Sequence, residues 1–296
     1  MRCNGSEDKS EKGVLYVCAT PIGNLRDITL RALEVLQAVD FVIAEDTRVA
    51  KRLLNRYRIK KPLISFHEHS PKSRLHHLLH LLEDGKSLAI ISDAGTPCIS
   101  DPGAEIVNAA LSRGYKVVPI PGPSAAIAAL SVAGIRAQRF MFLGFLPRNR
   151  RDRVELLNGI KHWRHPIVIY EAPHRLVETI RELFDVLGNR RLVMARELTK
   201  QFEEIFATDL ESALRRYTSV KPIGEFTLVI EGHREDVRDE TAGHDNAEID
   251  AFIRKELERG LTTREIVKSL MERFGMQRRD AYKRTIAIRE SIQCSQ

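Results

Sequence analysis

Residues 88–103 read LAIISDAGTPCISDPG, an apolar run followed by a long loop rich in glycine, proline and aspartate. Residues 88–91 are all apolar instead of alternating, which is typical of a strand in a sheet that is covered on both faces. Two glycines, two prolines and two aspartates within residues 92–103 exceed what a strand-to-helix connection of about 2 to 6 residues needs. We therefore interpret residues 92–103 as a binding loop in an α/β fold.

The same alternation of apolar runs and helical periods extends from Gly13 to Gly232 and predicts an α/β architecture throughout. The predicted strands are residues 14–19, 41–44, 88–92, 116–120, 139–143, 167–170, 191–195 and 226–230. In an open parallel sheet, the loops at the carboxyl ends of strands line the ligand crevice. Two further loops in such positions are TPIGNL, residues 20–25, and PIPGPSA, residues 119–125.

The length of 296 residues predicts more than one domain, and 43% apolar with 29% charged residues excludes a mainly disordered chain. We expect a disordered tail over 1–12, an N-terminal α/β lobe over 13–134, a C-terminal α/β lobe over 135–232, a linker over 233–248 and a helical module over 249–296. The module is predicted to hold three short helices, at 249–259, 262–274 and 277–292, which resemble a helix-turn-helix unit. Thr262 or Thr263, with Glu265 close behind, is expected to cap the middle helix.

Several classes of protein are excluded by what the sequence lacks. No apolar run approaches the roughly 20 residues of a membrane span, and the polar first twelve residues do not resemble a secretion signal, so a cytoplasmic location is expected. The sequence has no Walker A and no GxGxxG motif, which argues against a nucleotide triphosphatase and against an ordinary Rossmann dinucleotide enzyme. The four cysteines are too scattered for a CxxC metal site or a disulfide framework. His76, His77 and His80 are interpreted as the polar side of an amphipathic helix. No metal is expected.

Seven motifs in order carry a resemblance to a known family: ATPIGNL, AEDTR, SFHEH, SDAGTPCISDPG, PIPGPSA, YEAPHR and GEFTLVIEG. The chain closely resembles the bacterial small-subunit ribosomal RNA methyltransferase I family, which methylates a cytidine ribose 2′-oxygen in 16S RNA and belongs to the tetrapyrrole-methylase superfamily. The resemblance implies a bilobal α/β fold with S-adenosylmethionine in the cleft between the lobes, a homodimer, and a helix-turn-helix extension. Carried onto this chain, it implies cofactor contacts from Pro21, Asp93, Ala94, Gly95, Ser124, Ala125, Tyr170, Glu171, Ala195, Arg196, Glu225, Phe226 and Thr227.

A ribose hydroxyl is a poor nucleophile, so a carboxylate or histidine that accepts its proton would accelerate methyl transfer. The candidates on loops of the first lobe are Glu45, Asp46, His67, Glu68, His69 and Asp101. For Glu45 and Asp46, an equally good interpretation is an acidic N-cap for the helix that begins near Thr47. Spacing does not choose among the candidates.

An RNA substrate requires positive charge near the site. The chain has 47 Lys and Arg against 40 Asp and Glu, with seven basic and no acidic residues over 48–61 and eight basic against two acidic over 136–164. Arg26, Arg48, Arg148, Arg150 and Arg151 are therefore predicted to contact RNA. The alternatives are a tetrapyrrole small-molecule methylase, which shares the fold and cofactor, and a non-catalytic ribosome-assembly factor that binds RNA.

Overall fold

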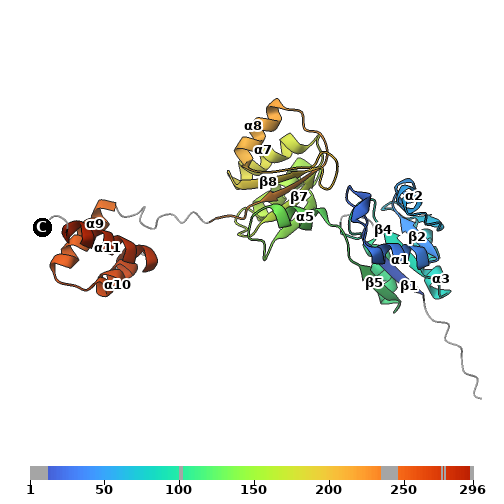
Figure 1. Ribbon diagram of the computed structural model, residues 1–296, viewed down its shortest axis with the longest axis horizontal. Helices are drawn as coiled ribbons and strands as arrows, with labels where there is room; N and C mark the ends of the chain where they lie inside the picture. Colours follow the sequence, from blue (N-terminus) through green and yellow to red (C-terminus); the bar gives the residue numbers. More distant parts are fainter. Residues whose placement is uncertain (1–12, 100–102, 235–245, 275, 277, 294–296) are drawn as a thin grey trace, which may run out of the picture. The chain divides into compact units, whose positions relative to one another are not determined.

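A computed structural model of the chain describes residues 13–99, 103–234, 246–274, 276 and 278–293 (Figure 1). The chain divides into two compact units, Met1–His233 and Arg234–Gln296. The predicted tail over 1–12 and most of the predicted linker over 233–248 lie outside the described residues.

The first sheet contains five parallel strands in the order β3-β2-β4-β1-β5. The strands are β1 (Val14–Cys18), β2 (Phe41–Ala44), β3 (Leu63–Ser65), β4 (Leu88–Ile91) and β5 (Lys116–Ile120). One face packs against α1 (Leu30–Ala38) and α2 (Thr47–Arg56), and the other against α3 (Lys72–Glu83) and α4 (Ala104–Ser112). All four residues of β4 are buried because the strand is central and both of its faces are covered.

The second sheet is mixed, with the order β6-β7-β10-β8-β9, and only β6 and β7 are parallel. Its strands are β6 (Met141–Phe145), β7 (Ile167–Glu171), β8 (Arg191–Arg196), β9 (Glu204–Asp209) and β10 (Phe226–Ile230). Helix α5 (Ala125–Val132) packs on one face, and α6 (Arg150–Gly159), α7 (Leu176–Leu187) and α8 (Leu210–Ser219) pack on the other. The predicted lobe boundary at residue 134 lies just after α5. The apolar side chains of α5, however, pack against the second sheet.

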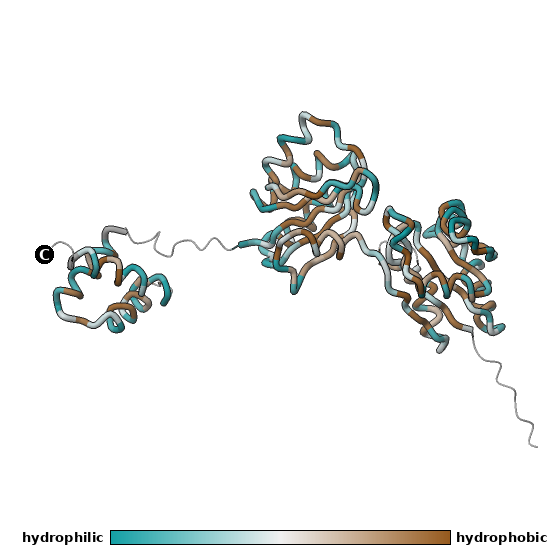
Figure 2. The backbone as a smooth tube through the Cα atoms, in the orientation of Figure 1, coloured by the Kyte–Doolittle hydropathy of each residue, from teal (hydrophilic) through white to brown (hydrophobic). Residues whose placement is uncertain are grey.

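Both sheets form apolar cores, and their strands are mainly brown in the hydropathy colouring of Figure 2. The second core also contains a buried charge pair between Arg153 and Glu182, whose side chains are 3% and 6% exposed. Arg153 Nη1 additionally donates to the carbonyls of Pro147 and Arg148, at 3.0 and 3.2 Å. The pair therefore fixes the connection from β6 to α6, where the predicted RNA contacts at residues 148–151 lie.

The C-terminal unit consists of α9 (Asn246–Glu258), α10 (Thr263–Phe274) and α11 (Arg278–Gln293), which pack around Ile253, Leu270 and Ile288. Thr262 and Glu265 form a capping box, since Thr262 N–H donates to Glu265 Oε2 at 2.8 Å and Glu265 N–H donates to Thr262 Oγ1 at 3.4 Å. The predicted helical module and its cap are confirmed. None of the described helices has the length and apolarity of a membrane span.

Candidate functional site

The first two candidate loops lie side by side because β1 and β4 are parallel neighbours. Thr20 N–H donates to the Gly95 carbonyl at 2.8 Å, and Gly95 N–H donates to the Thr20 carbonyl at 3.1 Å. The buried Thr20 hydroxyl donates to the Ser92 carbonyl at 2.9 Å. These bonds join TPIGNL to SDAGTP at the carboxyl edge of the first sheet.

The third loop joins the same edge. The Thr96 hydroxyl donates to the Pro123 carbonyl at 3.3 Å. Gly95 has φ +85°, and an added Cβ would lie 3.4 Å from Ile22 Cγ2 and 3.7 Å from the Pro123 carbonyl oxygen. The backbone here therefore needs glycine, mainly for its left-handed conformation.

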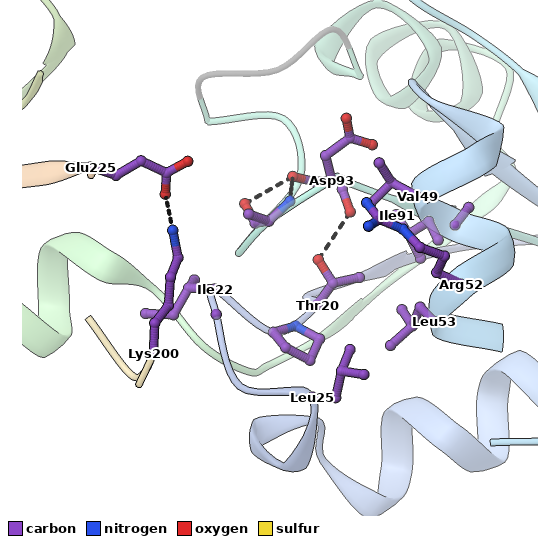
Figure 3. Close-up of a pocket in the computed structure, with 15 residues that line it drawn as sticks. Thr20, Ile22, Leu25, Val49, Arg52, Leu53, Ile91, Asp93, Lys200 and Glu225 are labelled. Atoms are coloured by element: carbon purple, nitrogen blue, oxygen red, sulfur yellow. Dashed lines mark hydrogen bonds and ion pairs between the residues drawn. The ribbon is translucent and has the colours of Figure 1, made fainter. Parts of the chain in front are cut away.

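A cavity of about 530 Å³ opens beside the first two of these loops (Figure 3). Its lining includes four of the predicted cofactor residues: Pro21, Asp93, Ala94 and Glu225. Apolar side chains make up much of the remainder, from Ile22, Leu25, Val49, Leu53 and Ile91, and the cations are Arg52 and Lys200. A mainly apolar cavity with a few convergent charged groups is typical of a small-molecule site.

Lys200, on the loop between β8 and β9, was not among the predicted residues. Its ammonium lies 2.9 Å from Glu197 Oε1 and 2.9 Å from Glu225 Oε2. Burial is the largest single influence on both groups and opposes their charged forms. The hydrogen bonds and charges around them, from Glu225 and from each other, together outweigh it, so the pKa of Lys200 is raised and that of Glu197 is lowered. The lysine therefore stays protonated at the mouth of the cavity.

The loop that carries Lys200 has an unusual backbone. Glu197 and Thr199 are non-glycine residues with φ of 52° and 63°. Such conformations cost of order 1 to 3 kcal/mol each and are held by surrounding contacts. One such contact comes from Asn24, whose N–H donates to Thr199 Oγ1 at 3.0 Å. No glycine or proline marks this turn in the sequence, so turn-residue reasoning missed it.

The strand ends of the second sheet contribute two different sets of side chains. Tyr170, Thr227 and Ala195 are register neighbours on the face that α5 covers. The Tyr170 hydroxyl accepts a hydrogen bond at 3.1 Å from Ala126 N–H, in the first turn of α5 after Ser124 and Ala125. One of the N–H groups in the first turn of α5, which have no partner within the helix, is therefore used within the fold.

Glu171 and Phe226 point to the opposite face of the second sheet. Glu171 is 1% exposed and accepts hydrogen bonds from Thr179 Oγ1 at 2.6 Å and from Ala172 N–H at 2.9 Å. Phe226 packs edge-on against Tyr217 in the core beneath α7 and α8. The structure does not bring these two side chains to the face that holds Tyr170. Arg196, beside Phe226, forms an ion pair with Glu204 at 3.1 Å.

Asp46 is the N-cap of α2, accepting a hydrogen bond at 2.8 Å from Arg48 N–H. The Arg48 side chain and N–H lower the pKa of Asp46 to about 2. A carboxylate with so low a pKa is a weak proton acceptor, which favours the capping interpretation. Asp46 N–H also donates to Asp93 Oδ1 at 3.3 Å, so the cap lies beside the cavity.

The remaining proton-acceptor candidates lie on loops that follow strands. Glu45 is exposed after β2, and His67, Glu68 and His69 are exposed after β3. None of these four lines the cavity. Asp101 lies outside the described residues.

The predicted RNA-contacting arginines fall into three places. Arg26, in the short 3-10 helix η1 (Leu25–Asp27), lines a second hollow of about 700 Å³ together with Arg56. Arg48 is 90% exposed and paired with Asp46. Arg148, Arg150 and Arg151 are exposed at the start of α6, where Arg150 lies 3.3 Å from Glu182.

The described residues offer no cluster of His, Cys, Asp or Glu that could hold a metal ion. His76, His77 and His80 are exposed on α3, as the amphipathic interpretation predicted. Cys18 is a free buried thiol, and burial raises its pKa to about 12. Such a thiol is inert as a nucleophile.

Sequence comparison establishes the family. Residues 14–214 match the model for tetrapyrrole (corrin/porphyrin) methylases. The ribosomal RNA small subunit methyltransferase I of Bacillus subtilis is 40% identical over 283 residues, covering 95% of this chain and 96% of that protein. The chain belongs to the tetrapyrrole methylase family, in its ribosomal RNA small subunit methyltransferase I branch. Its counterpart in Thermotoga maritima is 46% identical over 220 residues, 74% of this chain and 99% of that protein.

Solved structures of the same fold are more distant in sequence. The cobalt precorrin-4 methyltransferase CbiF aligns with a TM-score of 0.56 at 16% identity, over 77% of this chain and 98% of that one. Diphthine synthase aligns with a TM-score of 0.55 at 14% identity, over 74% and 90%. The predicted bilobal α/β fold and family are confirmed.

Proposed function

We propose that this chain is an S-adenosylmethionine-dependent methyltransferase that modifies the ribose 2′-oxygen of a cytidine in 16S ribosomal RNA. Membership of the branch supports ribosomal RNA methylation and use of the cofactor. The observation that carries the proposal is the cavity itself, which is lined by Asp93 from the carboxyl edge of the first sheet and by Glu225 from the loop before β10, beside an arginine-lined hollow.

The residues around the cavity fit S-adenosylmethionine. The apolar side chains of Ile22, Leu53 and Ile91 suit a purine ring, and the Asp93 carboxylate suits hydroxyl or ammonium donors. A volume of about 530 Å³ is in the range of ordinary ligand sites. When bound, the cofactor would supply a methyl group on a sulfonium sulfur, and the sulfur would keep the electron pair of the broken carbon–sulfur bond.

The chain's own task is to position the acceptor oxygen and to exclude water. Holding two reacting groups in line contributes about 7 to 11 kcal/mol to lowering a barrier. The paired loops at Thr20 and Gly95 provide a rigid platform for this, since their bonds join two neighbouring strands. Removal of the hydroxyl proton adds roughly 10² to 10⁴ in rate. The low pKa of Asp46 disfavours it as the acceptor, and the remaining candidates are Glu45, His67, Glu68, His69 and Asp101.

The test is transfer of labelled methyl from S-adenosylmethionine to purified small ribosomal subunits that lack ribose methylation, followed by mass-spectrometric mapping. We expect label on a single cytidine 2′-oxygen, and loss of label in Asp93→Ala. Transfer to a tetrapyrrole but not to the subunit would favour a small-molecule methylase. RNA binding without cofactor binding would favour a non-catalytic assembly factor.

The substrate also implies where the chain acts and with what. We infer a cytoplasmic protein that acts on the small subunit or its RNA, and a homodimer as in the resembled family. Light scattering at working concentration tests the dimer, since a mass near 33.7 kDa would mark a monomer.

A further inference from the structure

A second hollow adjoins the cavity and has a different character. It measures about 700 Å³ and shares Gly23, Leu25 and Lys200 with the cavity. The rest of its lining is Asn24, Arg26, Arg56, Thr199 and Gln201. Three cations and no carboxylate thus face one hollow, and we call it the basic hollow.

Two of these cations lack a carboxylate partner within the described part of the chain. Neither Arg26 nor Arg56 forms an ion pair there, in contrast to Arg48 with Asp46 at 2.7 Å and Arg216 with Glu204 at 2.8 Å. A protein surface of mixed charge normally places carboxylates near such guanidinium groups. Their absence from the basic hollow leaves its positive charge available to an anion.

The third cation, Lys200, is fixed in place by Glu197 and Glu225. Its two ion pairs hold the ammonium where the cavity and the basic hollow meet, and one of its three donors is left over. Arg52, four residues before Arg56 on α2, lines the cavity. Arg52 and Arg56 therefore lie on one helix face and lead from the cavity into the basic hollow.

The anion expected here is a phosphodiester. Arginine forks match phosphate oxygens in bidentate geometry, and the Asn24 and Gln201 amides can add neutral hydrogen bonds. An RNA whose acceptor ribose enters the cavity carries its neighbouring phosphates outside the cavity, by covalent connection. The basic hollow is the adjoining space with the matching charge.

We propose that the basic hollow, through Arg26 and Arg56, binds a backbone phosphate adjacent to the nucleotide that receives the methyl group. The proposal rests on the proposed function, because it takes RNA as the substrate. It adds a specific phosphate site between the loop after β1, the loop after β8 and α2. This site is distinct from the exposed arginines at residues 148–151.

A structural role for Arg56 would give a different signature. Arg56 lies in the last turn of α2, where a cation stabilises the helix dipole. Loss of that effect changes the melting temperature, whereas loss of a phosphate contact changes the salt dependence of RNA binding. The two readouts separate the roles.

The experiment uses the full chain with Arg26→Ala, Arg56→Ala and a matched control, Arg74→Ala, an exposed arginine on α3 at the opposite face of the first sheet. The probe is a small-subunit ribosomal RNA fragment, measured between 50 and 200 mM salt, roughly the range over which phosphate contacts are lost. We expect Arg26→Ala and Arg56→Ala each to weaken binding about tenfold and to reduce the salt slope by about 1. Affinity for S-adenosylmethionine, measured by calorimetry, should match wild type.

Variants that bind RNA like Arg74→Ala, with an unchanged salt slope, would overturn the proposal. So would a loss of S-adenosylmethionine affinity with RNA binding intact, since the basic hollow would then hold the cofactor's carboxylate. If the wild-type chain does not methylate the subunit, the proposed function is wrong, and the phosphate site is wrong as well. If the wild-type chain methylates the subunit but Arg26→Ala and Arg56→Ala bind RNA as Arg74→Ala does, the phosphate site is wrong and the proposed function stands.

Discussion

The N–H of Asn24 donates a hydrogen bond to the hydroxyl of Thr199 at 3.0 Å, across 175 positions of sequence. The bond joins the loop after β1 to the strained loop after β8. Gly23 makes this approach possible, because an added Cβ there would lie 2.6 Å from Lys200 Cγ and 2.7 Å from the Leu198 carbonyl oxygen. The backbone of the first loop therefore packs directly against the second loop.

Gly23→Ala is expected to separate the two loops and to lower kcat/KM for methyl transfer by about 10²-fold, since displacements near 1 Å can have that effect. The matched control is Gly159→Ala, at the end of α6, where no atom lies within 4 Å of the added Cβ. Methyl-transfer kinetics and thermal unfolding are measured for both. Equal activity of the two variants would show that the close approach is unimportant.

Charge reversal at Arg148 and Arg151 is expected to weaken binding of ribosomal RNA at moderate salt without changing cofactor affinity. Both side chains are exposed at the start of α6 and lie outside the cavity lining. The control is the double variant Lys72→Glu, Arg74→Glu on α3. RNA binding as tight as the control's, over the same range of salt, would remove this surface from the RNA contact.

Arg153→Met is expected to destabilise the fold by about 3 to 5 kcal/mol, because it leaves the buried carboxylate of Glu182 with only the exposed Arg150 as a cation partner. Replacing Glu182 as well, by Leu, should restore much of the loss. Denaturant unfolding of the single and double variants measures this. A single variant as stable as wild type would contradict the assigned role of the pair.

The same pair predicts a pH dependence. The Arg153 hydrogen bond outweighs burial and holds the pKa of Glu182 below its ordinary 4.5. A lowered folded-state pKa contributes stability above pH 4.5 that is lost as the pH falls through the folded-state value. The free energy of unfolding of Glu182→Gln should therefore fall less than that of wild type between pH 6 and pH 3, roughly the range in which a carboxylate titrates. Denaturant unfolding at each pH measures this.

Asp46→Asn is expected to keep most of kcat, whereas Asp46→Ala should lower the stability of the fold by about 1 kcal/mol. Asparagine retains the N-cap acceptor for Arg48 N–H, and alanine does not. The pH profile of kcat separates capping from proton transfer. A loss of 10²-fold or more in a folded Asp46→Asn variant would mark Asp46 as the proton acceptor after all.

All eight strands predicted from the sequence are present, because covered strands are apolar at successive positions regardless of their partners. The sequence missed β3, which has only three residues, and β9. β9 is an edge strand with half-exposed and exposed residues, so the burial that makes a strand recognisable is weak there. The order and direction of strands in the second sheet were also beyond the local pattern.

The sequence by itself determined the α/β class, the capping box at Thr262 and Glu265, and the glycine-rich loop that holds Gly95, since each is set by residues close together in the chain. Only the tertiary structure decided which strand-end side chains share a face. Tyr170 contacts α5 and Glu171 contacts α7, because successive residues of a strand point to opposite faces of the sheet. Which helix covers each face is decided by the tertiary packing. It also placed Lys200 at the cavity, through a strained turn held by contacts from distant residues.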